Sequence, residues 1–272
     1  MTRRRRRRSF GFPNWFLVLL FLGGLYLLEF AGQERDKRRD SDVEVKAKIP
    51  RSEGPPSPKF GGSVFLFDSK QSLTEPMVHR MARGQSNDHI SIWTVSGDRH
   101  AFATAPGFDR IHHFVNAYLE GYAPFEAENI FTPLQTLARV KTYQFDHLDA
   151  TGHQELWQTS REAFYYTRGD CEDHALALAD WLMEMGEDAR VVSGDYRGEG
   201  HAWVILFKNG KEYLFEATDK RRAMRQLSLA SMHPDYQPRW MFNRDYFWYN
   251  TGSPCTVKYS GRKWKRKSRY AK

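Results

Sequence analysis

Two strand-like segments joined by a two-residue turn constrain the fold of this chain more than any other sequence feature. Residues 201–208 and 211–217 flank Asn209-Gly210, a dipeptide typical of a β-hairpin turn. This turn sets Lys208 opposite Lys211. Because side chains alternate along a strand, His201 and Glu216 then share one face as diagonal neighbours, and Asp219 points to the other. A bulge in the hairpin would reverse that choice in favour of Asp219.

A helix is predicted to begin at Cys171. Asp170 suits the cap before it, Gly186 follows its last turn, and its apolar stripe comprises Ala175, Leu178, Ala179 and Leu182. At a helix N-terminus the dipole and free N–H groups favour a thiolate over a thiol, and they could also donate to an oxyanion. A lone cysteine is also a common small core residue, and this alternative stays open at this point.

A shorter helix is predicted just before it. Thr159-Ser160-Arg161-Glu162 has the spacing of a capping box, so this helix starts there and runs to about Thr167. Gly169 suits a left-handed exit from it. The order of elements is then helix, turn, Cys171 helix and hairpin.

The residues around these elements resemble a known family. From Trp157 to Asp173 the chain carries a tryptophan, a threonine and a glutamate ahead of a Gly-Asp-Cys-Glu-Asp box, and Gly200-His201-Ala202-Trp203 and residues 215–218 come after it. Over roughly residues 110–220 this pattern resembles the bacterial transglutaminase-like cysteine proteinases of the transglutaminase-like superfamily. Two departures are Glu216 where the family more often has aspartate, and the lack of the asparagine typical of the proteinase branch in the strand after it.

The resemblance implies an α+β, papain-like or transglutaminase-like fold and a cysteine hydrolase. A helix carrying Cys171 would pack on an antiparallel sheet carrying His201 and Glu216. Cys171 would be the nucleophile, His201 the base and Glu216 the orienting acid. The expected reaction is hydrolysis of a protein or peptide amide through a thioacyl-enzyme. Transfer of the acyl group to an amine and a non-catalytic binding module of the cell envelope are the alternatives.

The resemblance implies no required cofactor but points to calcium. Family members that clip adhesins bind calcium with acids around the nucleophile, and Asp170, Glu172 and Asp173 match those positions. The alternative is that these acids only cap the helix and stabilise its positive end.

An apolar segment near the N-terminus predicts a membrane anchor. Residues 9–31 form a transmembrane helix in this interpretation, and six arginines precede it. Positive flanks stay in the cytoplasm, so the chain is expected to cross the inner membrane once with its catalytic domain in the periplasm. A cleaved signal peptide is the alternative. A reporter active only outside the cytoplasm, fused after residue 60, should be active; a silent but stable fusion would reject this orientation.

The remaining chain is divided by composition. We expect a basic cytoplasmic tail (1–8), the anchor (9–31), a linker (32–62), an N-terminal extension of the catalytic domain (63–107), the transglutaminase-like domain (108–250) and a disordered basic tail (251–272). The net charge of +8 comes from six arginines at one end and seven basic residues at the other, which leaves residues 9–260 at −5. Nucleic acid is therefore not an expected partner; the expected partners are a membrane and an envelope protein or peptide.

The sequence supports two further expectations, one about residues 111–119 and one about the two cysteines. Residues 111–119 show the spacing of an amphipathic helix, on which His112 and His113 would be partly exposed. The sequence also leaves open whether Cys171 and Cys255 form a disulfide.

Overall fold

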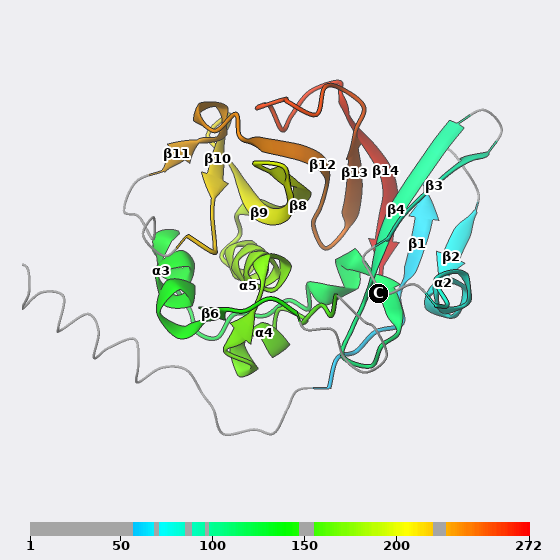
Figure 1. Ribbon diagram of the computed structural model, residues 1–272, viewed down its shortest axis with the longest axis horizontal. Coiled ribbons are helices and arrows are strands. Elements are labelled where there is room, and N and C mark those ends of the chain that lie inside the picture. Colours follow the sequence, from blue (N-terminus) through cyan, green and yellow to red (C-terminus); the bar gives the residue numbers. More distant parts are fainter. Residues whose placement is uncertain (1–56, 68–70, 85–88, 96–97, 147–154, 220–226) are drawn as a thin grey trace, which may run out of the picture. The chain divides into compact units, whose positions relative to one another are not determined.

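The computed structural model describes residues 57–67, 71–84, 89–95, 98–146, 155–219 and 227–272, all within the unit Pro50–Lys272 (Figure 1). The predicted anchor at 9–31 and most of the predicted linker lie outside the described residues. Within the described ranges, no helix is long and apolar enough to cross a bilayer.

A twisted antiparallel sheet forms the centre of this unit. Its nine described strands run in the order β11-β10-β9-β8-β12-β13-β14-β1-β2. Every neighbouring pair is antiparallel. In chain order the strands are β1 (Ser63–Leu66), β2 (Ser72–Thr74), β8 (Asp188–Tyr196), β9 (Glu199–Lys208), β10 (Lys211–Phe215), β11 (Ser228–Leu229), β12 (Tyr236–Phe242), β13 (Tyr246–Asn250) and β14 (Trp264–Ala271).

Helices and smaller sheets surround this sheet. Figure 1 shows α5 beside β8 and β9, with α3 and α4 next to it. The other described elements are α2 (Glu75–Met81), β3 (His89–Val95), β4 (Asp98–Pro106), β5 (His112–Phe114), η1 (Val115–Tyr118), α3 (Phe131–Val140), β6 (Thr142–Tyr143), α4 (Glu162–Tyr165), β7 (Arg168–Gly169), α5 (Cys171–Glu184) and η3 (Ala230–Met232). The fold is a mixed α/β fold with a sheet-rich core, which agrees with the prediction of a domain built from helices and an antiparallel sheet.

Strand β9 contributes to hydrophobic clusters on both faces of the sheet. Ala202, Val204 and Leu206 join the main core with α5, whereas Trp203 and Ile205 join a second cluster under Tyr259. A strand buried on both faces has little freedom to slip by one residue, because a slip would exchange the two sets of side chains. The strand that carries His201 is therefore held in a fixed register.

The predicted hairpin is confirmed. Lys208 pairs with Lys211 and Val204 with Phe215, which is the expected register without a bulge. Asn209 and Gly210 both have positive φ, at 52° and 69°, as a tight hairpin turn requires. The ladder ends at Phe215, so Glu216 lies just beyond it.

The expected amphipathic helix at 111–119 is wrong. These residues form β5 and the 3-10 turn η1, and both His112 and His113 are buried. The apolar spacing did not indicate a helix here, because every residue from 112 to 119 is buried. Such a segment has no solvent face, so the helical period carries no information there.

The expected basic tail is also wrong. Residues 264–271 form β14, which pairs with β13 on one side and β1 on the other. Trp264, Ser268 and Tyr270 are buried, while basic side chains between them point outward. The expected boundaries at 107 and 250 therefore do not separate structural units, because β1 and β14 belong to the same sheet as β8 and β9.

Candidate active site

Cys171 is the first residue of α5, as predicted. Asp170 precedes it in an extended conformation and forms no side-chain cap hydrogen bond. The predicted role of Gly169 needs correction, because its φ is not positive and it lies in the short strand β7. A Cβ at this position would lie 2.2 Å from Oδ2 of Asp173. Gly169 thus allows the start of α5 to approach β7 closely.

The preceding turn fixes the chain that leads into Cys171. The backbone N–H of Thr159 donates to Glu162 Oε2 at 2.8 Å, and the N–H of Glu162 donates to Thr159 Oγ1 at 3.2 Å. These reciprocal bonds are the predicted capping box. Helix α4 is shorter than expected, since it ends at Tyr165.

His201 and Glu216 are hydrogen-bonded to each other. Nε2 of His201 lies 2.9 Å from Oε2 of Glu216, which is buried. The structure therefore brings together the pair expected from the hairpin. Asp219 is half-buried and lines a hollow of about 420 Å³ next to this pair.

Other donors hold the carboxylate of Glu216 in place. Tyr236 donates its hydroxyl to Oε2 at 2.8 Å, and Thr218 donates both its N–H (2.9 Å) and its hydroxyl (2.7 Å) to Oε1. Burial alone would raise the pKa of Glu216, but the bonds from His201 and Thr218 outweigh burial and keep the pKa below its ordinary value. Glu216 is therefore a fixed anion that orients the imidazole through Nε2, which leaves Nδ1 as the nitrogen available to a reacting group. Tyr236 and Thr218 were not expected from the sequence.

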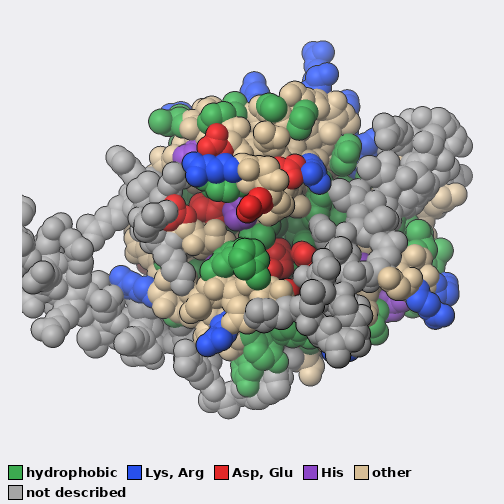
Figure 2. All heavy atoms as spheres, in the orientation of Figure 1, with side chains coloured by type: hydrophobic (Ala, Val, Ile, Leu, Met, Phe, Trp, Pro, Cys, Tyr) green, Lys and Arg blue, Asp and Glu red, His purple; other side chains and the backbone are tan. Residues whose placement is uncertain are grey.

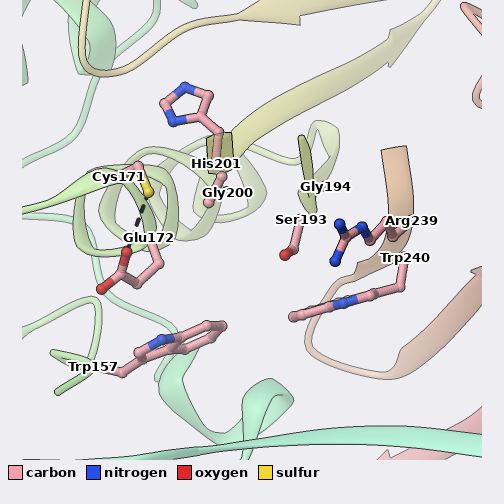
Figure 3. A pocket seen from close by; sticks show the side chains of 10 residues that line it. Trp157, Cys171, Glu172, Ser193, Gly194, Gly200, His201, Arg239 and Trp240 are labelled. Carbon is pink, nitrogen blue, oxygen red and sulfur yellow. Dashed lines mark hydrogen bonds between the residues drawn. The ribbon is translucent and has the colours of Figure 1, made fainter. Parts of the chain in front are cut away.

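The thiol of Cys171 and the ring of His201 line one cavity of about 330 Å³. Figure 3 shows both side chains along one side of it and the indole rings of Trp157 and Trp240 along another. The backbone of Ala202, the residue after His201, also forms a hydrogen bond with the thiol. The helix and the strand thus place the predicted nucleophile and base at the same opening.

The thiol is in an environment that opposes ionisation. Burial raises the pKa of Cys171 to about 12, and the negative charge of Asp170 adds to this. The Sγ–H donates to Oε2 of Glu172 at 3.4 Å, the dashed line in Figure 3. The prediction of a thiolate near neutral pH is therefore contradicted, because desolvation and nearby acids outweigh the helix dipole.

Alkylation of Cys171 should consequently depend steeply on pH. Since its thiol pKa is raised, the reactive thiolate fraction increases about tenfold per pH unit through the neutral range, with no plateau. Iodoacetamide kinetics on a Cys255→Ser variant measure this directly. Both cysteines are free and Cys255 is exposed, so Cys255 should label faster in the unmodified chain at neutral pH. A rate plateau for Cys171 near pH 7 would contradict the structure.

The acids around Cys171 divide into two groups. Carboxylate oxygens of Asp146, Asp170 and Glu172 lie within 4.8 Å of one another. Asp173 does not join them; its Oδ1 accepts the N–H of Gln158 at 2.8 Å. The expected set of Asp170, Glu172 and Asp173 is therefore corrected: the acids brought together by the fold include Asp146, which sequence spacing could not identify.

A buried lysine, Lys141, follows α3 and bonds to the chain ahead of Cys171. Nζ of Lys141 donates to the carbonyls of Ala163 (2.9 Å) and Tyr166 (3.2 Å) and to Oε1 of Gln158 (3.3 Å). Its charge lowers the pKa of Asp173, although burial has the larger effect and raises it. Its bonds thus join the end of α3 to α4, and its charge acts on the first turn of α5. His174, which follows Cys171 by three residues, is fully buried, with Nδ1 3.4 Å from the carbonyl of Ala217.

Acidic side chains gather in the middle of the face shown in Figure 2. The three acids beside Cys171 are brought together by the fold, and Glu216 is bonded to His201, which lines the same cavity as Cys171 and Glu172. Burial raises the pKa of Glu172 well above its ordinary value, so the charge of this acid is disfavoured.

Comparison with known proteins is consistent with a peptidase-like domain. Residues 155–269 match the family model described as the CEP76 peptidase-like domain; this region contains Cys171, His201 and Glu216 but is less than half of the chain. Centrosomal protein of 76 kDa from Xenopus tropicalis is 35% identical over 78 residues, which are 27% of this chain and 12% of that protein.

A solved structure was also found. A candidate cysteine protease from Cytophaga hutchinsonii aligns over 59% of this chain and 72% of its own, with a TM-score of 0.29 and 10% identity, which is too low to show a common fold. The matching family model is a peptidase-like domain and not a transglutaminase-like one. It therefore agrees with the predicted peptidase class, whereas membership of the transglutaminase-like superfamily stays a prediction. In residues 155–269, this chain is similar to the CEP76 peptidase-like domain.

Proposed function

We propose that this chain is a cysteine peptidase of the transglutaminase-like kind. The observation that carries the proposal is the shared cavity of Cys171 and His201, with His201 held through Nε2 by the buried carboxylate of Glu216. This is the nucleophile, base and orienting acid that a thioacyl mechanism needs.

The chemistry starts from a protonated thiol. For reaction the Sγ–H turns from Glu172 toward Nδ1 of His201, which takes the proton as Sγ attacks the carbonyl carbon of a peptide amide. The resulting imidazolium lies against the ionised Glu216, which stabilises it. His201 then returns the proton to the leaving amine, and water resolves the thioacyl-enzyme. The free N–H groups at the start of α5 are the proposed donors to the oxyanion.

Two alternatives use the same cavity in a different way. An amine in place of water as the acyl acceptor would make the enzyme a transglutaminase. The raised pKa of Cys171 and its bond to Glu172 favour the other alternative, a binding module that does no chemistry. Because all three functions involve the same residues, they must be told apart by their products.

One experiment separates them. The full chain, purified in detergent, is incubated with a peptide library, and new termini are identified by mass spectrometry. Cleavage that is lost in Cys171→Ala supports the peptidase. Incorporation of an added fluorescent primary amine at glutamine residues, without cleavage, supports the transglutaminase. Neither product from a correctly folded chain supports the binding module and contradicts the proposal.

Calcium is a proposed ligand of the acids beside the nucleophile. Oδ1 of Asp170 and Oε1 of Glu172 are buried and form no hydrogen bond to the described residues, and Asp146 lies beside them. Hard oxygen donors of this kind fit calcium. Asp146, Asp170 and Glu172 would hold the ion, whose charge would offset theirs next to Cys171. Calcium binding measured by calorimetry should be lost in Asp146→Asn; unchanged binding would reject these ligands.

The location outside the cytoplasm also remains a proposal. It rests on the arginines and the apolar run at residues 3–31. The substrate proposed on this basis is a protein or peptide of the cell envelope.

A further inference from the structure

A second cluster of polar side chains lies where α2 meets β5, near the opposite end of the large sheet from the hairpin of His201 (Figure 1). Glu75 and His79 are one turn apart on α2, and His113 lies on β5. One ligand atom from each lies within 4.8 Å of the other two. Glu75 and His113 are buried, and the side chain of His79 is 32% exposed.

The separations between these atoms suit a small metal ion. Oε2 of Glu75 lies 3.1 Å from Nδ1 of His113 and 3.4 Å from Nε2 of His79. Ligand atoms at about 2.0–2.1 Å from a tetrahedral zinc ion are about 3.4 Å from one another. Two imidazoles and one carboxylate are also a donor set that proteins use for zinc and for non-haem iron.

Two of the three side chains, Glu75 and His113, are held by further hydrogen bonds, as metal ligands usually are. Nε2 of His113 is 2.9 Å from Oδ2 of Asp109, and Oε1 of Glu75 accepts the N–H of Phe114 at 3.4 Å. A ligating histidine usually donates its other N–H to a carboxylate, which fixes the tautomer and points the free nitrogen at the ion. Here that nitrogen is Nδ1, the one that faces Glu75.

Two further observations point to a ligand. Nε2 of His79 is buried and forms no hydrogen bond to the described residues. This nitrogen lies 3.4 Å from Oε2 of Glu75 but does not have the geometry of a hydrogen bond to it. The ring of Phe60 stacks on that of His113 with centroids 3.4 Å apart, which shields this side of the cluster from water. A buried nitrogen without a hydrogen bond costs stability unless something binds it.

We propose that Glu75, His79 and His113 bind one divalent transition-metal ion, with zinc as the first candidate. Three protein ligands leave a fourth position for water. The ion joins α2 to β5 and so fastens the N-terminal part of the described chain to the core. The proposal does not depend on the function proposed for Cys171.

The competing interpretation needs no metal. A protonated His113 between the buried Glu75 and the exposed Asp109 would form an ion triad with the same distances. The two interpretations differ in what an added ion does: a metal site binds it in a fixed ratio, and an ion triad does not.

Cobalt(II) is the probe that distinguishes them. The full chain in detergent is freed of metal with a chelator and titrated with cobalt(II), followed by visible absorption. We expect saturation at one equivalent, with d–d bands but without the thiolate charge-transfer band that binding at Cys171 would give. Zinc should displace the cobalt and raise the melting temperature.

Two variants and one control complete the test. His79→Gln removes a half-exposed ligand and is expected to fold, and Glu75→Gln removes the central one; both should lose the d–d bands and the rise in melting temperature. His233→Gln changes a histidine outside the cluster, bonded to Ser228, and should lose neither. Absence of saturable binding, or binding unchanged in His79→Gln, would overturn the proposal. A thiolate charge-transfer band would place the ion elsewhere and overturn it too.

Discussion

Glu216→Gln should slow acylation of Cys171 by roughly 10²–10⁴-fold, by analogy with triads in which the orienting carboxylate was made neutral. In the proposed mechanism Glu216 keeps the proton on Nε2 of His201 and stabilises the imidazolium formed during attack. A neutral amide keeps the shape but not the charge, and its NH₂ group can favour the wrong tautomer. The rate is measured as the release of p-nitrophenol from p-nitrophenyl acetate, so no natural substrate is needed.

Asp219→Asn is the matched control. Asp219 lines the hollow beside the pair, but the carboxylate on the imidazole is that of Glu216. We expect less than a tenfold change for Asp219→Asn. Because Gln cannot accept all the bonds that Glu216 accepts from Thr218 and Tyr236, thermal melting must show that Glu216→Gln is folded at the assay temperature. A damaging Asp219→Asn with a mild Glu216→Gln would contradict the assignment.

Asp180→Ala should destabilise the fold by about 3–5 kcal/mol, because it leaves a buried network without its central acceptor. The side chain of Asp180 is 0% exposed and accepts Nε of Arg244 at 2.6 Å. It also accepts the hydroxyl of Ser160 and the N–H of Tyr122. These bonds connect α5 to the segment before α3 and to the turn between β12 and β13. Denaturant unfolding of the two chains measures the difference.

Two variants show whether burial is the cause. Glu184 binds the same guanidinium at 2.8 Å, but its side chain is 39% exposed, so Glu184→Ala should cost about 0–1 kcal/mol. Burial raises the pKa of Asp180 in spite of Arg244, which means that the fold disfavours its charge. Asp180→Asn, which keeps the shape, should therefore cost less than Asp180→Ala. Equal losses for Asp180→Ala and Glu184→Ala would contradict this account.

The hairpin and the Cys171 helix could be predicted because local signals there agree with tertiary structure. Asn209-Gly210 determines a register by turn geometry alone, and that register places Glu216 on His201. The capping box at Thr159 and Glu162 is also a local signal. In these places the chain's neighbours in sequence are its neighbours in space.

Strand β14 and the two side-chain clusters could not be predicted, because they depend on contacts that sequence spacing does not show. The basic residues of β14 are typical of a solvated tail, but Trp264, Ser268 and Tyr270 lie among them and are buried. Arg266 lies over the ring of Tyr246, at 4.5 Å from its centre, so its charge does not prevent packing. Asp146 and His113 join their clusters from other parts of the chain, so no periodicity could have found them.

The predicted thiolate at Cys171 is wrong for a different reason. The helix dipole was a sound local signal for a lowered pKa at Cys171. Its sign was reversed by burial and by Asp170, which acts more strongly in a poorly solvated site. In the proposed mechanism the thiol is therefore activated by His201 during the reaction and not in the resting state.

Trapping of an acyl group shows whether Cys171 forms an acyl-enzyme with the help of His201. The full chain and its His201→Ala variant are treated with p-nitrophenyl acetate at neutral pH, and the acetylated residue is identified by peptide mass spectrometry. We expect a burst of p-nitrophenol and an acetyl group on Cys171. Both should be lost in His201→Ala. Acetylation confined to Cys255 or surface lysines, or a Cys171 adduct that forms equally fast without His201, would contradict it.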